Sequence, residues 1–177
     1  MDHRIVLFRA MNTGGIRAPV TEQRAMAEAM GLANPRTLMA SGNLVVGSDR
    51  DPADLEAAIE AETEVRFGRL IETLVRTPAQ WAAMMAANPF ADAATSDPTR
   101  LLVMVMKGEI RPGAVEAMRA LATGDEAVEA VGGNLFFWHP DGIGASKMAG
   151  KAQPRLIGTG TGRNWNTVLK LAALVDL

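Results

Sequence analysis

Residues 36–75 read RTLMASGNLVVGSDRDPADLEAAIEAETEVRFGRLIETLV, and this stretch decides the fold. Its first part holds two apolar runs, Arg36 to Ala40 and Asn43 to Gly47, with Ser41-Gly42 between them. Two residues that include glycine, placed between runs of strand formers, are typical of a tight β-hairpin. We therefore expect two paired strands here.

A helix follows the hairpin, and its two ends are well marked. Asp51 is a good N-cap, Pro52 suits the first helical position, and Gly68 suits the end of the helix. Leu70 to Val75 is then rich in strand formers and predicts another strand. Residues 36–75 thus predict the order ββαβ.

The residues before this stretch add one strand and one helix. Arg4 to Met11 is a short apolar run that predicts a strand. A helix is expected from about Glu22 to Met30, with Thr21 as its N-cap and Gly31 at its end. The first half of the chain therefore predicts βαββαβ, which is the ferredoxin-like arrangement.

The second half predicts a similar order. Thr77-Pro78-Ala79-Gln80 resembles a capping box and opens a helix that stops before Pro89, and residues 91–98 predict a connection. The later expectations are a central strand at Leu101–Met106, a helix opened by Pro112, a hairpin of residues 127–131 and 134–138 around Gly132-Gly133, a loop over 139–162 with a helical turn near 146–151, and a last helix at about 164–174. We predict an α+β protein, one compact unit of 177 residues with two ferredoxin-like halves at about 1–90 and 91–177.

Composition narrows the class of protein. Hydrophobic residues make up 48% of the chain and charged residues 21%, as in a folded globular protein. The net charge is −2, whereas dedicated nucleic-acid binders usually carry a basic excess. There is no cysteine, no signal-peptide pattern and no apolar run long enough to span a bilayer, so we expect a cytoplasmic protein without Cys-based chemistry.

A polar loop after the first strand combines glycines with positive charge. It contains Arg9, Asn12, Gly14, Gly15 and Arg17. Two glycines let successive backbone N–H groups point at one spot, and the arginines add charge, so the pattern fits an anion site. It fits equally well a turn that needs positive φ, because glycine adopts such turns without any ligand.

A second glycine-framed segment leads into the last helix. Residues 158–167 read GTGTGRNWNT, and Arg163, Asn164 and Asn166 would stand at the helix start, where a carboxylate or phosphate is favoured. Asn164 or Thr161 could cap this helix. The alternative to an anion site is that the alternating glycines form a plain linker. Trp165 is expected to pack inward, because a large aromatic residue at a helix start is usually an anchor.

Residues 139–147 offer apparent catalytic groups that we interpret differently. His139, Asp141 and Ser146 could be drawn as a triad, or Ser146-Lys147 as a nucleophile and base. Triads are recognised by spatial roles and not by proximity in sequence, and Pro140-Asp141-Gly142 is a turn signal, so we expect a turn here. Lys147 stays a candidate anion contact.

Three further patterns have structural interpretations. Phe136, Phe137 and Trp138 are consecutive, so they point to alternate faces of a strand buried on both sides and do not form a base-stacking platform. The two histidines have no His or Cys partner at ligand spacing, so we expect no metal site and no cofactor. The carboxylates spaced along the helix after Asp51 predict a solvated face; they are Glu56, Glu60, Glu62 and Glu64.

Five motifs taken together resemble a known family. In chain order they are Arg9-Ala-Met-Asn-Thr-Gly-Gly15, Ser41-Gly-Asn-Leu-Val45, Asn88-Pro-Phe90, Asp141-Gly-Ile-Gly144 with Ser146-Lys147, and Arg163-Asn-Trp-Asn-Thr167. They resemble the bacterial domain-of-unknown-function family numbered 1697 over nearly the whole chain. The resemblance implies the duplicated ferredoxin-like fold and no established activity. The chain departs from the usual family pattern at Ala10, Ile16 and Gly47, where glycine, lysine and an aromatic residue are usual.

The polar segments stand out against an apolar scaffold, and such loops tend to carry function. We therefore expect a binding site for a small anionic ligand, with contacts among Arg9, Asn12, Gly14, Gly15, Ser41, Asn43, Lys147, Arg163, Asn164 and Asn166. Two alternatives remain, a nucleic-acid-associated module and a protein-interaction subunit without a ligand. No nucleophile or paired acid and base emerges that would define an enzyme.

Overall fold

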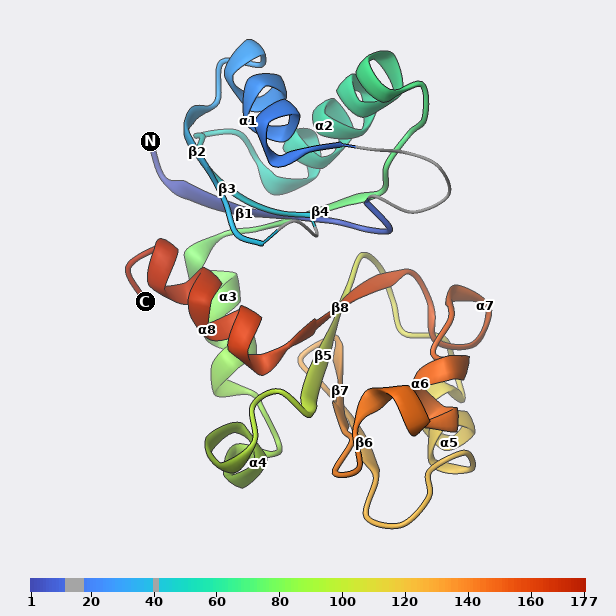
Figure 1. Ribbon diagram of the computed structural model, residues 1–177. Helices are drawn as coiled ribbons and strands as arrows, with labels where there is room; N and C mark the ends of the chain where they lie inside the picture. Colours follow the sequence, from blue (N-terminus) through green and yellow to red (C-terminus); the bar gives the residue numbers. More distant parts are fainter. Residues whose placement is uncertain (12–17, 40–41) are drawn as a thin grey trace. The chain divides into compact units, whose positions relative to one another are not determined.

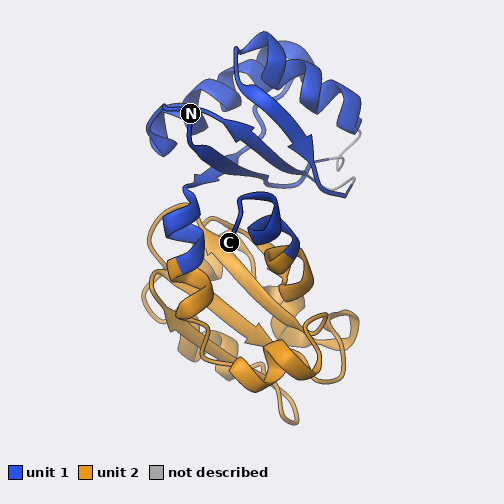
Figure 2. Ribbon diagram, turned by 90° about the vertical axis from the view of Figure 1, so that its left-hand side faces the viewer, with its two compact units in different colours: residues 1–82, 170–177 blue, residues 83–169 orange. Residues whose placement is uncertain are grey.

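The computed structural model describes residues 1–11, 18–39 and 42–177, and it divides into two compact units. Unit 1 comprises residues 1–82 and 170–177, and unit 2 comprises residues 83–169 (Figure 2). Unit 1 holds β1 (His3–Phe8), α1 (Val20–Ala29), β2 (Ala33–Thr37), β3 (Asn43–Gly47), α2 (Pro52–Phe67), β4 (Thr73–Arg76) and the start of α3 (Pro78–Ala86). Unit 2 holds α4 (Ala91–Ser96), β5 (Leu101–Met106), α5 (Ala114–Arg119), β6 (Ala127–Val131), β7 (Asn134–Trp138), the 3₁₀ turn η1 (Ile143–Ala145), α6 (Lys147–Lys151), α7 (Pro154–Ile157) and β8 (Gly160–Asn164). The last helix, α8 (Trp165–Leu174), starts in unit 2 and ends in unit 1.

Each unit contains a four-stranded antiparallel sheet, and the two sheets have the same strand order. The first sheet runs β2-β3-β1-β4 and the second runs β6-β7-β5-β8. In each sheet the first strand of the unit lies between the third and the fourth. The predicted α+β class with two ferredoxin-like halves is therefore confirmed.

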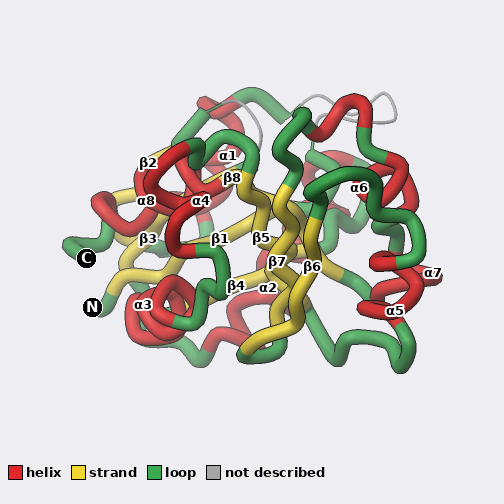
Figure 3. The backbone as a smooth tube through the Cα atoms, turned by 90° about the horizontal axis from the view of Figure 1, so that it is seen from below, coloured by secondary structure: helices red, strands yellow, loops and turns green. Residues whose placement is uncertain are grey.

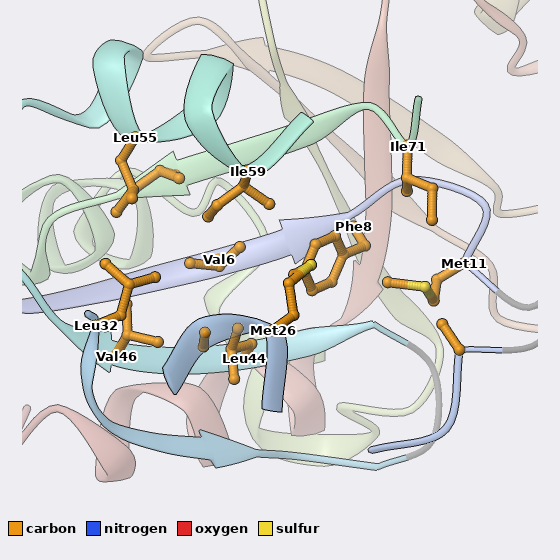
Figure 4. Close-up of a cluster of buried hydrophobic side chains, with 13 residues drawn as sticks. Val6, Phe8, Met11, Met26, Leu32, Leu44, Val46, Leu55, Ile59 and Ile71 are labelled. Carbon is orange, nitrogen blue, oxygen red and sulfur yellow. The ribbon is translucent and has the colours of Figure 1, made fainter. Parts of the chain in front are cut away.

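The core of unit 1 lies between its sheet and two helices. Figure 1 shows α1 and α2 on the same face of the first sheet. Alternate residues of β1 and β3 point at these helices, because successive side chains of a strand face opposite sides. Figure 4 shows this cluster, which includes Val6, Phe8, Leu44 and Val46 of the sheet, Met26 of α1, and Leu55 and Ile59 of α2.

Local capping signals were predicted correctly at two helices. Asp51 accepts a hydrogen bond from the N–H of Ala53 at 2.9 Å, and Gly68 ends α2 in the left-handed region at φ 72°. At α3 the N–H of Thr77 donates to Gln80 Oε1 at 2.9 Å, and the N–H of Gln80 donates to Thr77 Oγ1 at 3.1 Å. This reciprocal pair is a complete capping box.

Two local predictions in unit 1 were wrong. Thr21 does not cap α1, because the helix starts earlier, with Pro19 at the cap position and no side-chain hydrogen bond there. The β2–β3 hairpin is longer than two residues: its last paired residues are Thr37 and Leu44, and Leu38 N–H still donates to Asn43 O at 3.0 Å. The strand expected from Arg36 accordingly begins at Ala33.

The carboxylates of α2 do more than form a solvated face. β4 lies at the edge of its sheet, so its outward N–H groups need acceptors. Glu60 Oε1 accepts from the N–H of Thr73 at 2.9 Å, and Glu56 Oε1 accepts from the N–H of Val75 at 2.8 Å. These two residues thus close the edge of the sheet, which corrects the prediction for them.

The core of unit 2 covers one face of the second sheet. In Figures 1 and 3, α5, α6 and α7 lie on one side of this sheet and α4 lies on the other. Met118 of α5, Met148 of α6 and Ile157 of α7 pack with Met106 and Phe137 from the strands. The β6–β7 hairpin has the predicted two-residue turn, in which Gly132 and Gly133 have φ values of 58° and 76°. Positive φ at both central residues is the geometry that favours glycine.

The segment with alternating glycines is a strand and not a linker. β8 pairs with β5 from Gly160 opposite Met106 to Asn164 opposite Leu102. A Cβ at Gly160 would lie 2.8 Å from Val105 O and 2.9 Å from the sulfur of Met106. Glycine is needed here because the strand packs closely on its neighbour. Within the predicted loop over 139–162, the expected helical turn near 146–151 is confirmed as α6, whereas α7 and the start of β8 correct the rest of the prediction.

Candidate functional site

Four of the predicted contact residues lie outside the described part of the chain. They are Asn12, Gly14, Gly15 and Ser41. The other six are placed by the structure, two in unit 1 and four in unit 2.

Arg9 and Asn43 in unit 1 both have clear structural partners. Arg9 Nη1 lies 2.6 Å from Glu72 Oε2 in an ion pair, so its charge is balanced within the fold. Asn43 is buried, and its Nδ2 donates to Leu38 O at 3.1 Å, which helps to close the β2–β3 hairpin. Neither side chain requires a ligand to explain its position.

Arg163 of β8 has a partly buried guanidinium. Its Nη1 donates to Thr161 Oγ1 at 2.7 Å and to Gly162 O at 2.9 Å, two neutral oxygens. Burial lowers the pKa of Arg163 to about 10, because removal from water disfavours the charged form. The group still carries its positive charge at neutral pH.

Asn164 is the N-cap of α8; Asn164 and Thr161 were the two residues predicted for this position. Its Oδ1 accepts from the N–H of Thr167 at 3.0 Å and from the Thr167 hydroxyl at 3.1 Å. The N–H of Trp165 donates to Pro98 O, and its ring is buried with its centroid 6.5 Å from that of Phe136. The packing role predicted for Trp165 is confirmed, and Asn166 lies half-buried in the same turn.

Lys147 and Arg163 lie on opposite sides of the second sheet. Lys147 is exposed at the start of α6, whose Met148 packs with Met106 on the face covered by helices. Arg163 is paired with Val103, and paired residues share a face. Val103 alternates with Leu102 and Met104, which pack against the helices, so Arg163 points to the other face.

A buried polar cluster of unit 2 was not predicted from the sequence. Glu126 Oε1 lies 3.3 Å from His139 Nδ1, and Glu126 Oε2 accepts from the N–H of Thr123 at 2.9 Å. The Ser146 hydroxyl also hydrogen-bonds to this carboxylate, and Ser146 Oγ accepts from the N–H of Ala149 as the N-cap of α6. Serine and histidine both bind the carboxylate, so the cluster does not have the order of a catalytic triad.

This cluster makes the stability of unit 2 depend on pH. Burial raises the pKa of Glu126, but hydrogen bonds from Ser146, Thr123 and His139 outweigh it, so the net pKa is below the ordinary value. A depressed carboxylate pKa adds stability above the pKa of the unfolded chain, and this is lost as pH falls through the folded pKa.

We expect Glu126→Gln to be less stable than the wild type at pH 7, with the difference shrinking below about pH 4. Urea unfolding at pH 7 and pH 3 measures this, with the exposed Glu109→Gln as the matched control in the same unit. An equal loss of stability at both pH values would contradict the role given to the ionised carboxylate.

Other candidate features of unit 2 are structural. Phe136 and Phe137 are buried at 0% and 1% exposure, so they offer no open surface on which a base could stack. Across the described residues, no three His, Asp or Glu side chains gather as metal ligands. None of the helices in that part of the chain has the length and apolar character needed to cross a membrane.

The fold defines the class: an α+β protein with two four-stranded antiparallel sheets of the same strand order. The family described as "Protein of unknown function (DUF1697)" matches residues 1–136, and the chain belongs to this family.

The fold is shared with a solved structure. It is described as "The structure of conserved bacterial protein SP0830 from Streptococcus pneumoniae". The two are 18% identical with a TM-score of 0.79, and the match covers 100% of this chain and 99% of the other. A search of the curated proteins found no match.

Proposed function

We propose that this protein binds a small anion and that Arg163 is the main contact. The observation that carries the proposal is the partly buried guanidinium on β8, with Nη1 held by Thr161 and Gly162. Removing a cation from water is costly, and proteins keep such groups where their charge is used.

The chemistry of the side chain suits an oxyanion. A guanidinium presents five N–H donors in a planar fork that matches the oxygens of a carboxylate or phosphate. Charge-assisted hydrogen bonds of this kind are stronger when water is partly excluded. Asn164 and Asn166 follow Arg163 at the start of α8, but Asn164 Oδ1 is already used to cap this helix.

The start of α8 offers fewer free backbone N–H groups to an anion than the sequence suggested. The N–H groups of Trp165 and Thr167 are used by Pro98 O and Asn164 Oδ1 within the fold. The proposal therefore rests on the side chain of Arg163 and not on the helix terminus. For loop 12–15 and Ser41, a contact with an anion remains a prediction from sequence.

A thermal-unfolding screen tests the proposal. The panel contains phosphate, nucleotides, sugar phosphates, acidic metabolites and short oligonucleotides, the last to test the nucleic-acid alternative. A ligand at a hundredfold excess over its Kd adds about 2.7 kcal/mol, or roughly 5–10 °C in Tm for a chain of this size.

Substitution of Arg163 distinguishes a binding role from a structural one. We expect Arg163→Gln to abolish the ligand-induced rise in Tm, and Arg163→Lys to keep a smaller rise because it retains charge without the planar fork. Arg119→Gln is the control, since Arg119 is an exposed arginine of unit 2 that pairs with Glu129. A full rise in Tm in Arg163→Gln would overturn the proposal.

A further inference from the structure

Trp138 ends β7 and stays partly exposed, although Phe136 and Phe137 before it are buried. It alternates with Phe137, whose side chain packs against the helices on one face of the second sheet, so the indole points to the other face. Figures 1 and 3 show α4 on that other face. The register of β7 therefore directs the indole of Trp138 towards α4.

Between Trp138 and α4 lies a cavity of about 450 Å³. The helix contributes Asp92 and Ser96 to its wall, and these residues are four positions apart, so their side chains lie one above the other on the same helix face. Phe90, just before the helix, also lines the cavity. Two aromatic side chains and a carboxylate thus meet at one cavity within unit 2.

Asp92 gives this cavity a negative charge that the fold does not balance. It is exposed and forms no ion pair with a lysine or arginine among the residues that the structure describes. Arg100 is the basic residue nearest to Asp92 along the chain, but its Nε lies 3.2 Å from Asp97 Oδ2 and its Nη1 donates to Pro140 O. The carboxylate of Asp92 is therefore left for a ligand.

Aromatic rings and a carboxylate attract one kind of ligand in common, an organic cation. A cation within about 6 Å of a ring centre is attracted to the face of the ring, and tryptophan is the strongest aromatic partner. An alkyl chain on the cation can in addition bury its surface against the apolar part of the wall. An anion, in contrast, would be repelled by the carboxylate.

We propose that this cavity binds a small alkylammonium ion, with the positive charge between the indole of Trp138 and the carboxylate of Asp92. Two independent features carry the proposal: the strand register that turns the indole towards α4, and the unpaired carboxylate on the helix face that lines the cavity. Arg163 is not part of this site, because β5 lies between β7 and β8 and Arg163 does not line the cavity. The proposal therefore does not depend on the anion site.

The three tryptophans of the chain provide the readout. Indole N–H signals are recorded by NMR while n-butylammonium chloride or tetramethylammonium chloride is added, with sodium chloride at equal ionic strength as the reference and 1-butanol as the neutral analogue. We expect the Trp138 signal to shift in a saturable way with at least one of the two cations and not with 1-butanol. The signals of Trp81 and Trp165 should not move, because these residues are 0% and 5% exposed.

Substitutions separate a cation site from a plain apolar cavity. Asp92→Asn should raise the Kd about three- to fivefold, because the opposite charge beside the ligand is removed. Asp125→Asn is the control, since Asp125 is an exposed carboxylate of unit 2 outside the cavity, and its Kd should equal that of the wild type. Trp138→Leu should abolish binding, followed through the amide signal of Ser96, and Trp138→Phe should keep weaker binding.

The absence of a saturable shift of Trp138 with both cations would overturn the proposal, and so would an equal affinity for 1-butanol. An unchanged Kd in Asp92→Asn would overturn it as well, and this arm does not require a Trp138 variant to fold.

Discussion

Gly160→Ala is expected to destabilise unit 2 by about 3 kcal/mol, because overpacking at a tightly packed position usually costs 1–3 kcal/mol. The new methyl carbon would lie 2.8 Å from a backbone carbonyl, that of Val105, and 2.9 Å from the sulfur of Met106. The methionine side chain can move, but the carbonyl belongs to β5, which pairs with β8. The strand pairing must therefore shift.

Gly150→Ala is the matched control for this prediction. Gly150 lies within α6, and a Cβ there meets nothing within 4 Å. Alanine is a better helix former than glycine, so this variant should be as stable as the wild type or more stable by about 0.5–1 kcal/mol. Urea unfolding monitored by circular dichroism measures both, and equal midpoints for the two variants would show that β8 does not need its glycine.

Trp81→Ala is expected to cost about 3–5 kcal/mol, the usual range for truncating a fully buried large aromatic residue. Trp81 is 0% exposed and stands in the first turn after the capping box of α3. Its loss leaves a large cavity, and Trp81→Phe should cost less because most of the volume stays filled. Urea unfolding compares these variants by the transition midpoint and by the slope of the unfolding free energy against urea concentration.

The exposed Val65→Ala is the control for Trp81→Ala. Val65 is 82% exposed on α2 of the same unit, so its truncation should change the free energy of unfolding by no more than about 0.5 kcal/mol. A loss below about 1 kcal/mol for Trp81→Ala would contradict the buried position of the indole.

Features set by a few neighbouring residues were predictable from the sequence. The Asp51 cap, the Thr77–Gln80 capping box and the Gly132-Gly133 turn each depend on side chains or φ angles within four residues. The βαββαβ order of the first half follows from such signals and from hydrophobic periodicity.

Features that depend on distant partners were not predictable. β8 is rich in glycine, which is uncommon in strands, and its pairing with β5 joins residues about sixty positions apart, such as Leu102 and Asn164. Glu56 and Glu60 look like any exposed helical carboxylates until β4 is placed beside them. In both cases tertiary contacts decide the role.

The same distinction holds for the candidate site. Asn164 could be predicted as a cap because the helix it caps is adjacent in sequence. Residue type alone could not reveal that Lys147 and Arg163 belong to opposite sides of a sheet. Trp138 carried a usable signal, since it alternates with Phe137 and so faces the opposite side of β7, but residue type alone could not show that α4 leaves a cavity beside it.

Titration calorimetry with inorganic phosphate, pyrophosphate and citrate tests the central claim of anion binding at Arg163 most directly. The account predicts saturable heat with at least one of these anions, a weaker Kd in Arg163→Lys, no binding at that site in Arg163→Gln, and an unchanged Kd in Arg119→Gln. The absence of saturable heat with the wild-type protein, or the same number of sites and the same Kd in Arg163→Gln, would contradict it.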